Sequence, residues 1–253
     1  MSALALRILA CVCMLLDHIG FCFAGRWSFL EPLRWIGRLA FPLYVFLIVN
    51  GFRHTSDRLR YALRLALFAV ISQVPFALMT HPGTMLGTLN VFVTLLLALL
   101  TVWMTDRMRR NRFTKYLSFL PALTVYLVYY FGLLRSDYGA KGVLLAMTFY
   151  LFDGNILLQG LGMLVSIYHQ YIVSFGFFCL YRLLGRPYAI QPPSAWELTQ
   201  LFSLLALVPI FFYNGKKGRL PASRGGAKAV QLGFYLFYPL HILALYGLKQ
   251  LLR

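Results

Sequence analysis

The chain has 253 residues, of which 60% are apolar or aromatic and only 12% are charged. A soluble domain of this length has too small an interior for that apolar share, and disorder needs the opposite bias. The 24 Lys and Arg against 7 Asp and Glu leave a net charge of +17. In so apolar a chain this excess indicates the basic loops of a membrane protein and excludes nucleic acid as the expected partner.

Lipid is therefore the expected solvent, and a spanning helix needs about 20 residues. We expect an all-α, polytopic integral membrane bundle of about nine transmembrane helices, forming one domain over residues 1–253. The first apolar segment lacks the pattern of a cleavable signal peptide and is expected to be retained. In chain order the apolar segments are 5–24, 35–52, 60–79, 87–104, 116–133, 139–153, 157–181, 197–213 and 230–249.

Basic residues gather in alternate loops of this scheme, which places three basic loops on one side of the membrane. The positive-inside rule assigns that side, and with it the N-terminus, to the cytoplasm. The outer segment 25–38 departs from the rule with three arginines. The basic loops carry Arg53, Arg58, Arg60 and Arg64; then Arg107, Arg109, Arg110, Arg112 and Lys115; then Lys216, Lys217, Arg219, Arg224 and Lys228.

Three ionisable residues are expected at one depth in the outer half of the membrane. Asp17 and His18 lie two-thirds along the first segment, and Arg38 lies near the start of the antiparallel second segment. Charges at membrane depth require partners and are functional candidates by default. His18 could serve as a general base. The alternative is a packing ion pair between Asp17 and Arg38, with His18 as a hydrogen-bonded core residue.

The remaining histidines differ in their expected depth. His241 lies in the middle of the last segment beside Pro239, which kinks a helix and leaves a carbonyl without its usual partner. A functional and a structural role are equally open for His241. His169 is a further candidate within the seventh segment, whereas His54 and His81 lie at segment ends, where a structural role is expected.

Two loop features suggest ligand contacts. A glycine-flanked basic turn contains Asn214, Lys216 and Lys217. Its backbone amides and lysines could bind phosphate. Alternatively, its charge could reflect the positive-inside rule alone. Asp137 could cap the sixth segment or face a substrate. The cysteines lack metal-ligand spacing, and we expect no metal.

Several short blocks together resemble the TraX family over nearly the whole chain. No single block would suffice, but the set is specific. The blocks are Leu15–Gly20 (LLDHIG), Gly37–Tyr44 (GRLAFPLY), Gly51–Thr55 (GFRHT), Ser72–Phe76 (SQVPF), Leu89–Asn90, Asp137–Gly139, Tyr213–Lys216 (YNGK) and Phe237–His241 (FYPLH).

The resemblance implies acyl transfer. TraX proteins are associated with acetylation of the pilin amino terminus by acetyl-CoA, and they resemble acyltransferase-3 proteins and heparan-α-glucosaminide N-acetyltransferase. The family's histidine falls on His18 with Asp17 as its partner, its arginine on Arg38 and its late histidine on His241. The phosphates of cytosolic CoA would then meet Arg53, Arg58, Asn214, Lys216 and Lys217.

The sequence thus predicts an acyl-CoA-dependent acetyltransferase of the bacterial inner membrane, acting on an amine or hydroxyl acceptor of unknown identity. The acceptor could be a pilin N-terminus or an envelope glycan. A transporter or flippase is the first alternative, since buried charges also build transport paths. A non-catalytic membrane factor for pilus or envelope assembly is the second.

Overall fold

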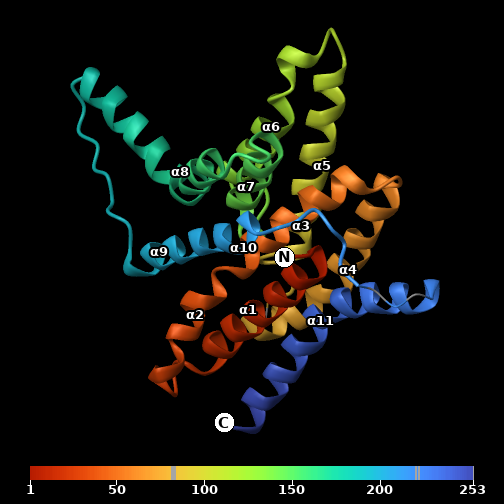
Figure 1. Ribbon diagram of the computed structural model, residues 1–253. Coiled ribbons are helices and arrows are strands. Elements are labelled where there is room, and N and C mark those ends of the chain that lie inside the picture. The colour runs from red at the N-terminus through yellow and green to blue at the C-terminus, as the bar shows by residue number, and fades with distance from the viewer. Residues whose placement is uncertain (81–83, 220, 222, 253) are drawn as a thin grey trace.

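The computed structural model describes residues 1–80, 84–219, 221 and 223–252, and in these residues it contains helices and no β-strand (Figure 1). His81 lies outside the described residues. Every predicted apolar segment contains helix, which confirms a polytopic helical membrane protein. Six stretches are long and apolar enough to cross a membrane: α1 (Ala3–Phe23), the run Ser28–His54, α4 (Arg58–Thr80), α5 (Val91–Arg110), α8 (Ile156–Leu183) and the Gly225–Leu251 part of α11 (Arg224–Leu251).

The other three predicted segments form shorter helices. They are α6 (Leu120–Tyr130), α7 (Gly139–Leu151) and the pair formed by the 3-10 helix η3 (Thr199–Ala206) and α10 (Leu207–Phe211). The run Ser28–His54 is also divided, into η1 (Ser28–Leu30), α2 (Pro32–Gly37) and α3 (Ala40–His54). The break at residues 38–39 places Arg38 between two helices and not within one.

Polar side chains begin four of the long helices. Ser2, Asn90, Asn155 and Ser223 each accept a hydrogen bond from a backbone N–H in the first turn of α1, α5, α8 and α11, respectively. These bonds satisfy donors that a helix start leaves without partners. Asn90 also donates from Nδ2 to the Ala69 carbonyl at 2.6 Å and to Gln73 Oε1 at 2.9 Å, so that this fully buried amide ties α5 to α4.

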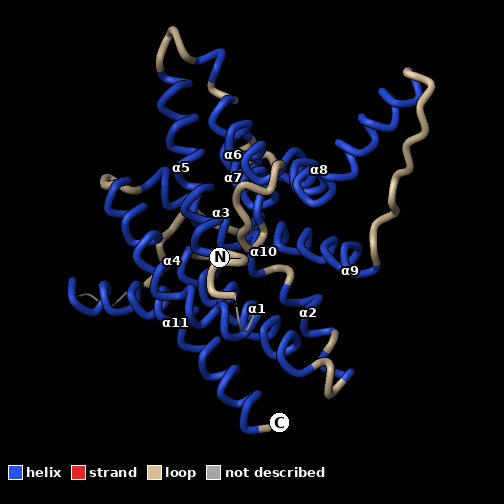
Figure 2. The backbone as a smooth tube through the Cα atoms, turned by 180° about the vertical axis from the view of Figure 1, so that it is seen from behind, coloured by secondary structure: helices blue, strands red, loops and turns tan. Residues whose placement is uncertain are grey.

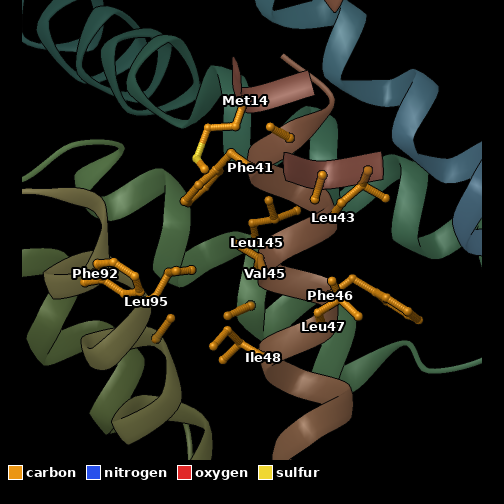
Figure 3. Packing of buried hydrophobic residues seen from close by; sticks show 14 of the residues in the cluster. Met14, Phe41, Leu43, Val45, Phe46, Leu47, Ile48, Phe92, Leu95 and Leu145 are labelled. Atoms are coloured by element: carbon orange, nitrogen blue, oxygen red, sulfur yellow. The ribbon is translucent and has the colours of Figure 1, made fainter. Parts of the chain in front are cut away.

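Helix α3 lies at the centre of the packing. Ten of its fifteen residues are buried, and α1, α5 and α7 pack around it. Figure 3 shows Phe41, Val45 and Ile48 of this helix directed toward Met14 of α1, Leu95 of α5 and Leu145 of α7. Because lipid tails are as apolar as these side chains, close packing and not the hydrophobic effect distinguishes this interior from the lipid-facing surface.

The two ends of α1 meet different parts of the chain. At its start, the amides of Ala3 and Leu4 donate to the carbonyls of Lys216 and Lys217. Beyond its end, the Arg26 guanidinium donates to the Leu252 carbonyl near the other terminus. The N- and C-terminal ends of the chain therefore lie at opposite ends of α1 (Figure 1).

Helix α8 departs from the bundle. Its backbone leaves the helical region at Tyr168, and the following half extends away from the other helices before a loop returns to α9 (Ala195–Leu198) (Figures 1 and 2). Only 17% of its apolar window is buried. Such an exposed apolar helix is suited to contact with lipid.

Gly37 allows a close approach between α1 and α2. A Cβ atom at this position would stand 2.7 Å from the Asp17 Cα and 2.7 Å from its Oδ1. Backbone cannot yield as a flexible side chain does, so only glycine fits there. Gly25, just beyond α1, would meet nothing within 4 Å.

Gly37→Ala is expected to destabilise the protein by about 1–3 kcal/mol, because the added methyl group forces α2 away from α1. The matched control Gly25→Ala should change stability by less than about 0.5 kcal/mol. Thermal unfolding of both variants in the same detergent checks this. Equal melting temperatures for the two variants would contradict the close contact.

Candidate functional site

One cavity of about 860 Å³ lies among α1, α3, α4, α5 and α11 and reaches the start of α7. From α1 it is lined by Ala3, Arg7, Met14, Asp17, His18 and Phe21. Their spacings of three, four and seven residues place them on one face of the helix. The cavity therefore follows α1 from its first turn to its last.

An ion pair fixes one end of this cavity. The Arg38 guanidinium donates to the Asp17 carboxylate and, through Nε, to the Arg34 carbonyl at 3.1 Å. Arg34 approaches the same carboxylate oxygen, with its Nε at 3.7 Å. The side chains of Arg38 and Asp17 are only 6% and 13% exposed. The convergence of Asp17 and Arg38 expected from their depths is thus present, with Arg34 as a second cation.

His18 is held by His241 and not by Asp17. Nδ1 of His18 lies 2.6 Å from Nε2 of His241, and the rings stack with centroids 4.9 Å apart. Nδ1 of His241 lies 2.5 Å from the Phe237 carbonyl. A carbonyl can only accept, so His241 carries its proton on Nδ1 and, when neutral, accepts at Nε2. His18 then donates from Nδ1 and keeps a lone pair on Nε2.

Asp137 and Tyr138 complete this end of the cavity. Tyr138 occupies the cap position of α7 without a side-chain cap bond, so Asp137 does not cap the helix and instead faces the cavity. Tyr138 has a left-handed backbone (φ 64°), and its ring stacks on the Phe41 ring with the two centroids 3.6 Å apart. Non-glycine residues in this region are strained and cluster at functional sites. Burial raises the pKa of Asp137 to about 6, against the opposing effect of Arg38.

The other end of the cavity is lined by cations. Arg7 of α1, Arg64 of α4, Lys217 of the loop before α11 and Lys228 of α11 all face it. We call these four residues the basic mouth. His18 follows Arg7 by eleven positions, which corresponds to about 16 Å along α1.

The basic residues proposed from sequence occupy several different environments. Arg53 pairs with Asp153 at 2.6 Å and donates to the Tyr150 carbonyl at 2.9 Å, joining α3 to α7. Arg58 pairs with Asp106 at 3.3 Å and covers the Phe52 ring. Among Arg53, Arg58, Asn214, Lys216 and Lys217, only Lys217 lines the cavity.

Asn214 and His169 have local structural contacts. The Asn214 side chain accepts from the Lys216 amide at 3.1 Å, which forms a turn. His169 is buried in α8, 3.0 Å from the Ser166 carbonyl, and lies outside the cavity that contains His18. His54 lines the cavity, and its Nδ1 lies 2.8 Å from the Asn50 carbonyl oxygen.

Sequence reasoning missed Arg34, Arg7, Arg64 and Lys228 as residues of the cavity. Spacing along the chain carried a signal for two of them. Arg7 lies eleven residues, about three turns, before His18 and therefore shares a face of α1 with it. Arg34 lies four residues before Arg38, at the end of α2, and approaches the same carboxylate. Arg64 and Lys228 depend on how α4 and α11 are rotated in the bundle, which spacing along one helix does not give.

The fold and the buried charged cavity define a polytopic helical membrane protein. The family model described as "TraX protein" matches residues 2–249, and the chain belongs to the TraX family. A relative from Dichelobacter nodosus, the "Probable fimbrial assembly protein FimC, serogroup H1", is 32% identical over 263 aligned positions, which cover 100% of this chain and 97% of the relative. No solved structure matches the chain.

Removing one partner of the Asp17–Arg38 pair is expected to destabilise the protein by about 3–5 kcal/mol, because a buried charge is left without compensation. Asp17→Asn should cost more than Arg38→Gln, since the first removes the partner of two arginines and the second leaves Arg34 beside Asp17. The double variant should lose less than the sum of the two single losses. Unfolding free energies from titration with a denaturing detergent measure the three values, and strict additivity would exclude the coupling.

The raised pKa of Asp137 predicts a pH-dependent effect of Asp137→Asn. The folded state disfavours the ionised carboxylate of Asp137. Ionisation of this group therefore does not reduce the free energy of unfolding below the ordinary pKa of 3.8, and reduces it fully above about pH 6. The variant should therefore gain stability relative to wild type as pH rises from 4 to about 6, with no further gain above that. Melting temperatures in detergent across this range test it. A pH-independent difference would show that the carboxylate is well solvated.

Proposed function

We propose that this TraX-family protein is a membrane acyltransferase that moves an acetyl group from acetyl-CoA to an amine or hydroxyl acceptor. The observation that carries this proposal is the single cavity that joins the basic mouth to His18, which is hydrogen-bonded to His241. A phosphate-bearing donor requires cations at one point and a reactive group at another. The cavity provides both, at separate ends.

The distance between the two ends suits a CoA thioester. Arg7 and His18 are about 16 Å apart along α1. The pantetheine arm has about as many backbone bonds as four residues of extended chain, and therefore spans roughly 14 Å. Phosphates at the basic mouth would thus place the thioester near His18.

In this proposal the lone pair on His18 Nε2 performs the chemistry. As the acceptor nitrogen or oxygen attacks the thioester carbonyl carbon, Nε2 removes its proton. The tetrahedral intermediate then collapses, the carbon–sulfur bond breaks, and the leaving thiolate takes the proton from His18. The products are the acylated acceptor and free CoA. A direct attack by Nε2, with transient acylation of His18, uses the same lone pair.

The remaining groups of the site support this role. Accepting at its Nε2, His241 fixes the tautomer of His18 and stabilises positive charge on the ring after proton transfer. Arg38 and Arg34 supply positive potential near the thioester oxygen, where negative charge develops in a low-dielectric site. Asp17 holds Arg38 in place.

Family membership and charge suggest the cellular setting. We place the protein in the bacterial inner membrane with the basic mouth and the N-terminus in the cytoplasm, where acetyl-CoA is available. The D. nodosus relative is named as a probable fimbrial assembly protein, and this name favours a pilus-related acceptor. An envelope glycan hydroxyl is the second acceptor class.

Release of CoA thiol from acetyl-CoA by the purified protein in nanodiscs tests the proposal, with peptide amines and sugars added in turn as acceptors. His18→Ala should lower turnover by about 10²–10⁴-fold, because the base is removed. His169→Gln is the matched control, a buried histidine outside the cavity, and should retain wild-type turnover.

Full activity of His18→Ala would eliminate this mechanism. A wild-type protein that consumes no acetyl-CoA with any acceptor would favour the transporter or the assembly factor. A burst of CoA release without acceptor would assign transient acylation to His18, whereas release only with acceptor would assign the role of base.

His241 is a positioning residue in this mechanism. His241→Gln retains an acceptor near His18 Nδ1 and should keep more turnover than His241→Leu, which offers none. Both variants should alter kcat more than KM, because His241 acts through His18 and not on the donor's phosphates. Equal losses in the two variants, or a change in KM alone, would contradict the tautomer assignment.

A further inference from the structure

We infer that the basic mouth, formed by Arg7, Arg64, Lys217 and Lys228, binds the phosphate groups of the nucleotide head of the donor. This inference rests on the proposed function and assigns its donor site to residues largely different from those that the sequence suggested. Four separate segments, α1, α4, the loop before α11 and α11 itself, bring these cations to one cavity.

The acidic residues of the chain leave the basic mouth without neutralisation. Asp17 pairs with Arg34 and Arg38. The other ion pairs in the described part of the chain are Arg53–Asp153, Arg58–Asp106, Arg60–Asp57 and Arg110–Asp106. Glu197 binds Tyr171 and Ser194. Among the described residues, no carboxylate forms an ion pair with a cation of the mouth.

Two of the four cations are not ordinary surface charges. Arg7 and Arg64 are only partly exposed. The Arg64 side chain is hydrogen-bonded to Tyr235 and lies over the Tyr61 ring, so its guanidinium is held at the cavity wall. Arginine binds phosphate oxygens through charge-assisted hydrogen bonds.

The positive-inside rule alone does not account for this arrangement. It explains exposed basic residues such as Arg112 and Lys115 in the loop beyond α5. It does not require cations from distant segments to line one cavity, one of them seven residues into the chain within an apolar helix. The mouth also joins the same cavity as His18, so an anion bound there lies on the path to the reactive end.

Equilibrium binding of CoA, 3′-dephospho-CoA and pantetheine to the protein in zwitterionic nanodiscs tests the inference. CoA should bind most tightly and pantetheine least, and CoA affinity should fall with salt. Arg7→Gln and Arg64→Gln should raise the Kd for CoA by about tenfold, the effect of one charge-assisted hydrogen bond. Lys217→Gln and Lys228→Gln, which are exposed, should raise it about two- to fivefold.

Two kinds of control accompany these variants. Arg112→Gln removes one exposed positive charge outside the cavity and should leave the Kd unchanged. Arg7→Lys retains the charge and should recover part of the loss, which separates a binding role from a folding role. If Arg7→Gln does not fold, Lys217→Gln, on an exposed loop, still gives a decisive measurement.

Turnover of S-acetylpantetheine, a donor without phosphates, separates this inference from the proposed function. Variants of the mouth should lose kcat/KM with acetyl-CoA and retain it with S-acetylpantetheine, whereas His18→Ala should lose both. CoA binding that depends on the mouth, without any acyl transfer, would support the site and refute the enzyme. Turnover with unchanged CoA affinity in all four variants would refute the site and support the enzyme.

A lipid headgroup is the other source of phosphate. In nanodiscs that contain anionic phospholipid, a mouth occupied by lipid would show competitive weakening of CoA binding. CoA affinity that is insensitive to all four substitutions, combined with lipid binding that is sensitive to them, would overturn the inference in favour of a lipid site.

Discussion

The ion pair between Asp17 and Arg38 is the constraint on which the arrangement of the site depends. A lone charge at membrane depth is costly, so each residue needs the other. To meet, they require α2 to approach α1 so closely that only glycine fits at position 37. The same contact positions α3 directly after Arg38, and α3 forms the centre of the core. Electrostatics at one point thus determines packing over several helices.

In the proposed mechanism the cavity separates anion binding from proton transfer, which would interfere if they took place at adjacent groups. Clustered cations near His18 would oppose its protonation by electrostatic repulsion. Here the basic mouth lies about three turns of α1 from His18, and the two arginines near His18 share the Asp17 carboxylate. In the proposed mechanism, anion binding at one end and proton transfer at the other could therefore be altered independently by substitution.

Hydropathy and depth were sufficient to predict part of this structure. The apolar segments matched helices because lipid imposes length and composition on each span separately. Asp17 and Arg38 could be brought together from residue counts, since rise per residue fixes depth. The rotation of each helix about its own axis could not be predicted in this way, because packing against neighbouring helices determines it. For that reason the sequence did not show that His241 holds His18, or that Arg53 and Arg58 turn to Asp153 and Asp106.

The interruptions within helices are a second feature that the sequence pattern did not predict. Segment 197–213 satisfies the hydropathy criterion, yet it is divided between a 3-10 and an α-helical stretch, and the long α8 bends at Tyr168. The bend at Tyr168 has no neighbouring proline or glycine that would predict it, whereas Pro209 lies in the first turn of α10, close to the change of helix type. The sequence pattern also did not determine the role of Asp137. Its position before an apolar helix favoured a helix N-cap, but Tyr138, with its left-handed backbone, occupies the N-cap position of α7.

The hydrogen bond between His18 and His241 spans 223 positions of the chain, and this separation orders the biogenesis of the site. Asp17 and Arg38 emerge from the ribosome within the first two hydrophobic stretches, so their charges can neutralise each other during early insertion. His18 acquires its partner only after α11 has been synthesised and docked. A nascent chain would thus enter the bilayer with the Asp17–Arg38 pair able to form but with His18 unoriented. In the proposed mechanism it would have no activity until the last helix is in place.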